Sequence, residues 1–170
     1  TSAEVCGAVQ FACANNLTIT VSGARTGISG GAVPSGGMLL SLERMNRICG
    51  LRRLADGNIL LHCQAGTTLS EIQKSFYEAK FSDSGDWDEE SLQSLEVIKS
   101  QRFFYPPDPT ETSATIGGTI ACNASGAHTF RHGPTRQYVH WLKIVLPDGR
   151  VLDIERQQYQ ADGNGIFRLQ

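Results

Sequence analysis

The residues with the clearest chemical potential lie in two glycine-rich segments that are far apart along the chain. The first segment, 22–31, holds four glycines in ten residues, and the second, 115–120, holds a glycine pair between β-branched residues. Glycine adopts positive φ without strain and lets a ligand approach the backbone closely. Backbone N–H groups that converge in such loops bind phosphate oxygens. The two segments predict a phosphate-binding site if they meet in space, although the first segment taken alone is more typical of a turn.

Hydroxyl side chains accompany the glycines. Each can donate a hydrogen bond to a phosphate oxygen, although loop hydroxyls more often bind the local backbone. They are Thr26, Ser29, Ser113, Thr115 and Ser125. The P-loop signature, the dinucleotide fingerprint and the nucleophile elbow are all absent from the sequence, which excludes a Walker-type ATPase and a serine hydrolase.

The composition limits the class of protein. The chain has 170 residues, 40% of them apolar and 19% charged, with a formal net charge of −2. A near-neutral chain without a basic stripe is not typical of a nucleic-acid binder. No stretch approaches the roughly 18 apolar residues that a membrane span needs. Five scattered cysteines predict buried, reduced thiols in the cytoplasm and no metal site; they are Cys6, Cys13, Cys49, Cys63 and Cys122.

Hydrophobic periodicity and turn signals predict a mixed α+β fold. Capping-box spacing starts a helix at Thr1 and another at Thr68, and Asp-Gly turns precede or join strands. The expected strands are 17–21, 38–41, 58–64, 139–146 and 150–154, and a short helix is expected at 92–99. The second glycine pair interrupts a β-like segment. The acidic segment 82–90 is interpreted as a solvated insertion, because charge runs usually face water.

Several strings in a fixed order then indicate a family. They include Ser-Gly-Ala-Arg-Thr-Gly-Ile-Ser-Gly-Gly, Gln-Ala-Gly-Thr-Thr-Leu, Pro-Pro-Asp-Pro-Thr, Ala-Thr-Ile-Gly-Gly-Thr-Ile-Ala-Cys-Asn-Ala-Ser-Gly and Val-Leu-Pro-Asp-Gly. From about residue 4 to 154 the chain resembles the PCMH-type FAD-binding module of the vanillyl-alcohol oxidase/p-cresol methylhydroxylase family. It is most similar to the glycolate oxidase and D-lactate dehydrogenase branch of that family.

The resemblance implies a truncated two-lobed fold with FAD between α+β lobes, roughly 1–80 and 103–170, and an acidic insertion near 82–100. It implies that the first segment holds the FAD pyrophosphate through backbone amides, that the proline-rich segment and the second glycine pair approach the cofactor, and that a third stretch touches the flavin nucleotide. The cofactor-binding residues implied are Gly23, Ala24, Arg25, Thr26, Gly27, Ile28, Ser29, Gly30, Pro107, Asp108, Thr112, Ser113, Ala114, Gly117, Gly118, Asn123, Ser125 and Gly126.

The chain also departs from the family pattern. Arg25 stands where glycine is usual, which costs of order 1 kcal/mol if its φ is positive. Ser22 replaces a commonly basic residue, and Thr26 stands where covalently flavinylated members carry histidine, so we expect non-covalent FAD. The first strand, the late Glu-Gly-Thr-Leu-Gly stretch and the substrate-capping domain are missing. We therefore expect the cofactor half of an enzyme, with weakened FAD affinity or none in the isolated piece.

The expected parent protein is a cytoplasmic FAD-dependent oxidoreductase that oxidises a 2-hydroxy acid such as D-lactate or glycolate by hydride transfer to FAD. Its partners are the small-molecule substrate, the cap domain and an electron-transfer partner. No residue of the chain is a convincing catalytic base, and His128 and His132 are interpreted as loop histidines near the cofactor. The alternatives are a UDP-sugar reductase of the same superfamily and a non-catalytic nucleotide-binding or assembly module whose acidic insertion docks a partner.

Overall fold

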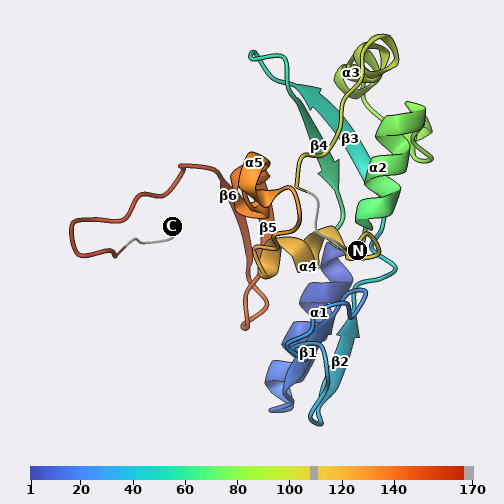
Figure 1. Cartoon of the computed structure of the whole chain (residues 1–170). Helices are drawn as coiled ribbons and strands as arrows, with labels where there is room; N and C mark the ends of the chain where they lie inside the picture. Colours follow the sequence, from blue (N-terminus) through green and yellow to red (C-terminus); the bar gives the residue numbers. More distant parts are fainter. Residues whose placement is uncertain (108–110, 167–170) are drawn as a thin grey trace. The chain divides into compact units, whose positions relative to one another are not determined.

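A computed structural model describes residues 1–107 and 111–166 of the chain (Figure 1). These residues form two compact units, one made of Thr1–Thr18 with the described residues from Val139 on, and the other of the described residues between Ile19 and Tyr138. Among them, four strands follow the first helix, a run of helices comes next and two strands come last, and the described strands pair as three two-stranded sheets. The expected α+β class is confirmed. The units divide the chain at other places than the expected lobes, roughly 1–80 and 103–170, which stay a prediction for the complete cofactor module.

Helix α1 (Ser2–Ala14) opens the first unit and begins as expected at Thr1. The Thr1 hydroxyl accepts a hydrogen bond from the Glu4 N–H at 3.3 Å and donates to the Glu4 carboxylate at 2.8 Å. This reciprocal pairing satisfies N–H groups that have no partner inside the helix.

Strands β5 (Trp141–Val145) and β6 (Val151–Glu155) form the antiparallel hairpin of the first unit. Gly149 takes φ of +82° in the turn, and its N–H donates to the Leu146 carbonyl at 2.9 Å. A Cβ at Gly149 would also collide with the side chain of Gln10 in α1. The predicted hairpin is confirmed, and its turn glycine is required twice, by conformation and by packing.

Strands β1 (Ile19–Ser22) and β2 (Met38–Ser41) form a parallel pair in the second unit. The first glycine-rich segment lies in the connection between them (Figure 1). The predicted strand at 38–41 is confirmed, whereas the one predicted at 17–21 begins two residues later, since the Leu17 N–H donates to the Ala12 carbonyl at 2.8 Å and belongs to the turn that ends α1.

Strands β3 (Ile48–Arg53) and β4 (Ile59–Cys63) form an antiparallel hairpin around Gly57, whose φ is +88°. The turn and β4 were predicted, but β3 was not. A register shift between Ile48 and Gly50 breaks the alternation of apolar and polar residues that identifies a strand in sequence.

Helices α2 (Leu69–Glu78) and α3 (Glu89–Ser100) belong with this hairpin to the second unit. The hydroxyl of Thr68 accepts from the Glu71 N–H at 3.2 Å and so caps α2, as predicted. A carboxylate oxygen of Asp88 accepts from the Ser91 N–H at 2.8 Å and caps α3. The buried core of the unit is drawn from both helices, from β3 and from the segments beside them; it comprises Ile48, Leu51, Leu69, Ile72, Phe76, Phe81, Trp87, Leu95, Ile98, Ala114 and Ile116.

The acidic segment between α2 and α3, which includes a short 3-10 helix (Ser84–Asp86), is solvated at most of its carboxylates, since Asp86, Asp88, Glu89 and Glu90 are exposed, but it also packs against β3. Trp87 is 8% exposed, and its indole N–H donates to the Ile48 carbonyl at 3.0 Å. A carboxylate oxygen of Asp83 accepts from the Ile48 N–H at 3.2 Å, and the Ser91 hydroxyl bonds both the N–H and the carbonyl of Leu51 at 3.1 and 3.0 Å. These side chains cover the edge of β3 that faces away from β4.

Three short helices, α4 (Ile116–Ala121), α5 (Thr129–His132) and a 3-10 helix (Thr135–Tyr138), follow the proline-rich segment. The second glycine pair therefore lies in a helix, and the β-like interpretation of 115–120 is wrong. The first turn of α4 is fixed by long-range bonds: the Ile116 N–H donates to the Thr67 carbonyl and the Gly117 N–H to the Ala65 carbonyl, both at 2.8 Å. Tertiary contacts thus override the local β preference.

The five cysteines are free thiols. Cys13 and Cys122 are exposed, so the expectation that every thiol is buried is wrong for these two, and Cys6, Cys49 and Cys63 are half-buried. No helix among the described residues has the length and apolar character needed to cross a bilayer.

Candidate functional site

The first glycine-rich segment presents backbone donors to solvent. Ser22 is fully buried at the end of β1, and its carbonyl accepts from the Leu42 N–H at 2.8 Å, which anchors the start of the loop. Beyond this anchor, Gly27, Ile28, Ser29 and Gly30 are exposed. In the described part of the chain, the N–H groups of residues 26–29 donate no hydrogen bond. Such a run of uncommitted amides is a donor set that suits phosphate oxygens.

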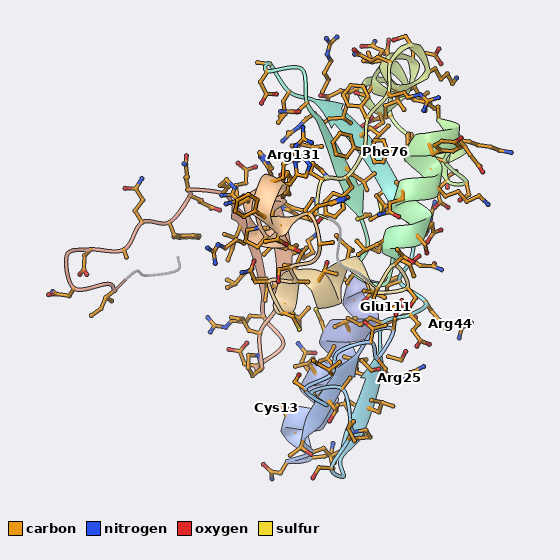
Figure 2. The ribbon with its side chains drawn as sticks, viewed as in Figure 1. Cys13, Arg25, Arg44, Phe76, Glu111 and Arg131 are labelled. Atoms are coloured by element: carbon orange, nitrogen blue, oxygen red, sulfur yellow. The ribbon has the colours of Figure 1, made fainter. Side chains whose placement is uncertain are left out.

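Arg25 holds this loop in a left-handed conformation. Its φ is +58°, so the strain expected for a non-glycine residue at this position is present. Its guanidinium pairs with the Glu43 carboxylate at 2.8 Å, and both side chains are about half exposed. Figure 2 shows Arg25 beside strand β2, which ends just before Glu43. Since an exposed ion pair contributes only about 0–1 kcal/mol, the pair offsets the backbone strain at most in part.

The residues just before the second glycine-rich segment are hydrogen-bonded to the start of α2. The Leu69 N–H donates to the Ala114 carbonyl at 3.0 Å and the Ser70 N–H to the Thr112 carbonyl at 2.8 Å. The Ser113 hydroxyl donates to the Glu111 carboxylate at 2.6 Å, which lowers the pKa of that carboxyl below its usual range. In this structure the Ser113 hydroxyl is therefore committed to a neighbour within the chain.

Gly117 and Gly118 have different surroundings. A Cβ at Gly117 would lie 2.8 Å from the Ala65 Cβ and 2.9 Å from its carbonyl oxygen, so packing within the chain already requires glycine there. A Cβ at Gly118 would meet only the Thr115 hydroxyl, at 3.2 Å, and Gly118 is exposed. Of the pair, Gly118 is the one whose open side is left for a ligand.

The two glycine segments meet at Thr115. A Cβ at Gly23 would collide with the Thr115 hydroxyl, and the same hydroxyl lies beside Gly118. Thr115 is itself 4% exposed. The start of the first loop and the first turn of α4 thus share one buried side chain, which is the proximity that the phosphate-site prediction needs.

The third segment makes mostly internal bonds. Asn123 takes φ of +46°, and its side-chain oxygen accepts from the Arg136 N–H at 3.0 Å. The Gly126 N–H donates to the Thr129 hydroxyl at 2.7 Å, while Ser125 is exposed. These contacts fix the turn after α4.

Of the remaining predicted residues, Ala24 and Thr26 are half-buried and Pro107 is buried, while Asp108 lies outside the described residues. Sequence reasoning missed Gly66, where a Cβ would collide with the Leu42 carbonyl. The string Gln-Ala-Gly-Thr-Thr, which is part of the family resemblance, contains this glycine, but no role was assigned to it.

Burial shifts the pKa of two side chains of the second unit. Desolvation raises the pKa of the Cys63 thiol to about 12, with a smaller contribution from Cys49. Desolvation also raises the pKa of the Tyr105 hydroxyl to about 12. Both groups are neutral at physiological pH and cannot act there as a nucleophile or base. Among residues 1–107 and 111–166, no group of three or more His, Cys, Asp or Glu side chains is placed to hold a metal ion.

Comparison with known proteins gives the class. The family model described as "FAD binding domain" matches residues 1–85 and 91–155. The chain belongs to this family of FAD-binding domains, and the resemblance inferred from the sequence is confirmed.

The relatives lie in the expected branch. A D-lactate dehydrogenase of Anaerostipes hadrus is 34% identical over 152 residues, which are 89% of this chain and 27% of that protein. A D-2-hydroxyglutarate dehydrogenase of Xanthomonas citri pv. viticola is 33% identical over 167 residues, or 97% of this chain and 30% of that protein. This chain thus spans less than a third of the length of either relative.

The solved structure of a chitooligosaccharide oxidase has the same fold. It superposes with a TM-score of 0.65 at 19% identity, covering 91% of this chain and 28% of that one. At this identity the likeness concerns the fold alone. It supports the expected truncated PCMH-type architecture.

Proposed function

We propose that this chain is the cofactor-binding portion of a flavoenzyme that oxidises a 2-hydroxy acid of the D-lactate or glycolate type to the 2-oxo acid. The observation that carries the proposal is the 34% identity to a D-lactate dehydrogenase over 89% of the chain. FAD, when bound, supplies the hydride acceptor. The substrate domain and the electron-transfer partner lie outside these residues, and the catalytic base is assigned to that other portion.

Within this portion, the work of the chain is to bind and orient the cofactor. The uncommitted N–H groups of residues 26–29 suit the negatively charged pyrophosphate. Gly118, where a Cβ would meet only the Thr115 hydroxyl, lets that group approach the backbone, whereas Gly23 is required by the packing of Thr115 against it. The residues present therefore fit the cofactor that the family name implies.

The proposal includes non-covalent FAD and a cytoplasmic location. Thr26 offers a hydroxyl where an imidazole would be needed for the covalent link that the family resemblance associates with this loop. The five free thiols suit a reducing compartment.

The test uses the full-length protein. We expect a yellow preparation with flavin absorption, release of all flavin into the supernatant on acid precipitation, and reduction of the flavin by D-lactate or glycolate. A colourless protein that takes up no added FAD would contradict the cofactor assignment. Flavin reduction by NADPH but by no 2-hydroxy acid would instead favour the UDP-sugar reductase alternative.

A matched pair of variants tests the placement of Gly118. We expect Gly118→Val to lose flavin, because the added side chain occupies the approach to the backbone. Gly7→Val, in α1 and outside both glycine-rich segments, is the control, since a Cβ at Gly7 meets nothing within 4 Å and its φ is not positive. Full flavin content in both variants would show that the cofactor does not approach Gly118.

A further inference from the structure

An open groove of about 820 Å³ lies within the second unit. Its walls are α2, the extended segment 102–106, and His128 and His132 at the two ends of α5. A space of this size is in the range that accommodates a small organic ligand. The lining residues do not include any residue to which the FAD site was assigned.

The walls of the groove are aromatic. Phe76, Tyr77, Phe103, Phe104 and Tyr105 all line it. Tyr77 and Phe104 are 79% and 69% exposed, so their rings are available to a ligand rather than used in the core. Figure 2 shows Phe76 on α2, which supplies the better-buried wall. Aromatic faces of this kind bind planar or apolar groups.

The charges of the groove have one sign. Lys74 and Arg102 line it, and no aspartate or glutamate in the described part of the chain does, although α2 itself contains Glu71 and Glu78. Arg102 lies over the Tyr77 ring at 5.8 Å from its centroid. Among the described residues, neither Lys74 nor Arg102 pairs with a carboxylate.

The imidazoles complete the far wall. The His132 ring meets the Phe104 ring edge-on at 5.9 Å between centroids and lies 6.2 Å from the His128 ring. Imidazole N–H groups are donors to carboxylate oxygens. Among the described residues, the groove therefore combines aromatic faces with the cations of Lys74 and Arg102.

We propose that this groove binds a free small-molecule carboxylate with an aromatic or similarly flat apolar body. The carboxylate lies near Lys74 and Arg102, and the apolar body lies against Tyr77 and Phe104. The cations, which pair with no described carboxylate, favour this class over a neutral aromatic compound. The exposed rings favour it over a short hydrophilic acid. The inference rests on the groove alone and does not depend on the proposed flavoenzyme activity.

Calorimetric titration with 3-phenylpropionate tests the proposal, because this probe has no 2-hydroxyl group and is not a substrate of the proposed reaction. We expect saturable binding, with at least tenfold weaker binding of 3-phenylpropanamide and of propionate. The titration is made on the full-length protein with and without FAD, whose binding is measured separately by flavin fluorescence. Failure of one assay is thus distinguishable from failure of the other.

Substitutions locate the binding. We expect Lys74→Gln with Arg102→Gln to weaken 3-phenylpropionate binding at least tenfold, and Phe104→Ala to weaken it several-fold. Lys80→Gln, an exposed cation outside the groove, is the control and leaves binding unchanged. The proposal is overturned if the neutral amide binds as tightly as the acid, or if the groove variants match the control. It is equally overturned if a peptide with adjacent Glu and Phe binds while the free acid does not.

Discussion

The different surroundings of Gly117 and Gly118 predict opposite effects of the same substitution. In Gly117→Ala the new Cβ lies 2.8 Å from the Ala65 Cβ, 2.9 Å from its carbonyl oxygen and 3.2 Å from its Cα. The Ala65–Thr67 strip cannot retreat easily, since it accepts the Gly117 and Ile116 N–H groups at 2.8 Å. Overpacking costs roughly 1–3 kcal/mol, and a rigid backbone neighbour places the cost near the upper end.

Alanine also regains about 1 kcal/mol of helix propensity over glycine. The net loss in the free energy of unfolding for Gly117→Ala is therefore about 2 kcal/mol. In Gly118→Ala the only contact is the Thr115 hydroxyl at 3.2 Å, so the same propensity gain leaves this variant equal to the parent or up to about 1 kcal/mol more stable.

Chemical denaturation followed by far-ultraviolet circular dichroism measures both variants. Thermal unfolding should give a midpoint about 4–8 °C lower for Gly117→Ala. Adding Ala65→Gly to Gly117→Ala should restore part of the loss, because it removes the 2.8 Å contact but leaves the carbonyl contact. Equal stability of the two alanine variants would refute the packing argument.

Three other predictions concern the first glycine-rich loop, the cysteine thiols and the buried hydroxyl of Tyr105. Replacing Arg25, whose φ is +58°, by valine should make the protein about 1–2 kcal/mol less stable than replacing it by glycine. Cys13 and Cys122 are exposed and should react first with an uncharged thiol reagent, whereas Cys63, with a pKa of about 12, should react last in the folded protein. Stability should fall as the pH rises from 9 towards 12, because the unfolded chain ionises Cys63 and then Tyr105 while the folded chain keeps both neutral.

Each of these has a direct readout. Urea midpoints compare the two Arg25 variants, and equal midpoints would contradict the assigned backbone conformation. Mass spectrometry of timed labelling orders the thiols, and early labelling of Cys63 would contradict its burial. Urea midpoints between pH 8 and 11 test the alkaline loss; Cys63→Ala should flatten the first part of the slope, since the thiol titrates in the unfolded chain from about pH 9.

Local chemistry explains which elements were predictable. Thr1 and Thr68 bond the N–H three residues ahead, and Gly57 and Gly149 take positive φ, so these helix starts and turns depend on short stretches of sequence. Strand β3 is not predictable from the sequence pattern, because its bulge removes the alternation of apolar and polar residues that identifies a strand. Helix α4 was misread because the signals that form it come from the Ala65–Thr67 strip rather than from its own residues.

In the candidate site, too, the local features were predictable from the sequence and the long-range contacts were not. Glycine content alone located the loop whose N–H groups at residues 26–29 donate no bond to the described residues. The contact between Gly23 and Thr115 joins distant parts of the sequence, and no local pattern encodes it. Likewise, the assignment of Gly117 to packing and of Gly118 to the open side needs the position of Ala65, which the sequence does not supply.

The side chains that occupy the outer edge of β3 have a consequence for assembly. An unpaired strand edge is a template on which another polypeptide can add a strand, which leads to fibres or exchanged dimers. Because the hydroxyl of Ser91 takes both backbone groups of Leu51, and Asp83 and Trp87 take those of Ile48, an incoming strand finds these groups already bonded. Removing the 82–90 segment would take away Asp83 and Trp87 and leave the backbone groups of Ile48 open to pairing, so any loss of partner binding in such a deletion would first have to be separated from aggregation.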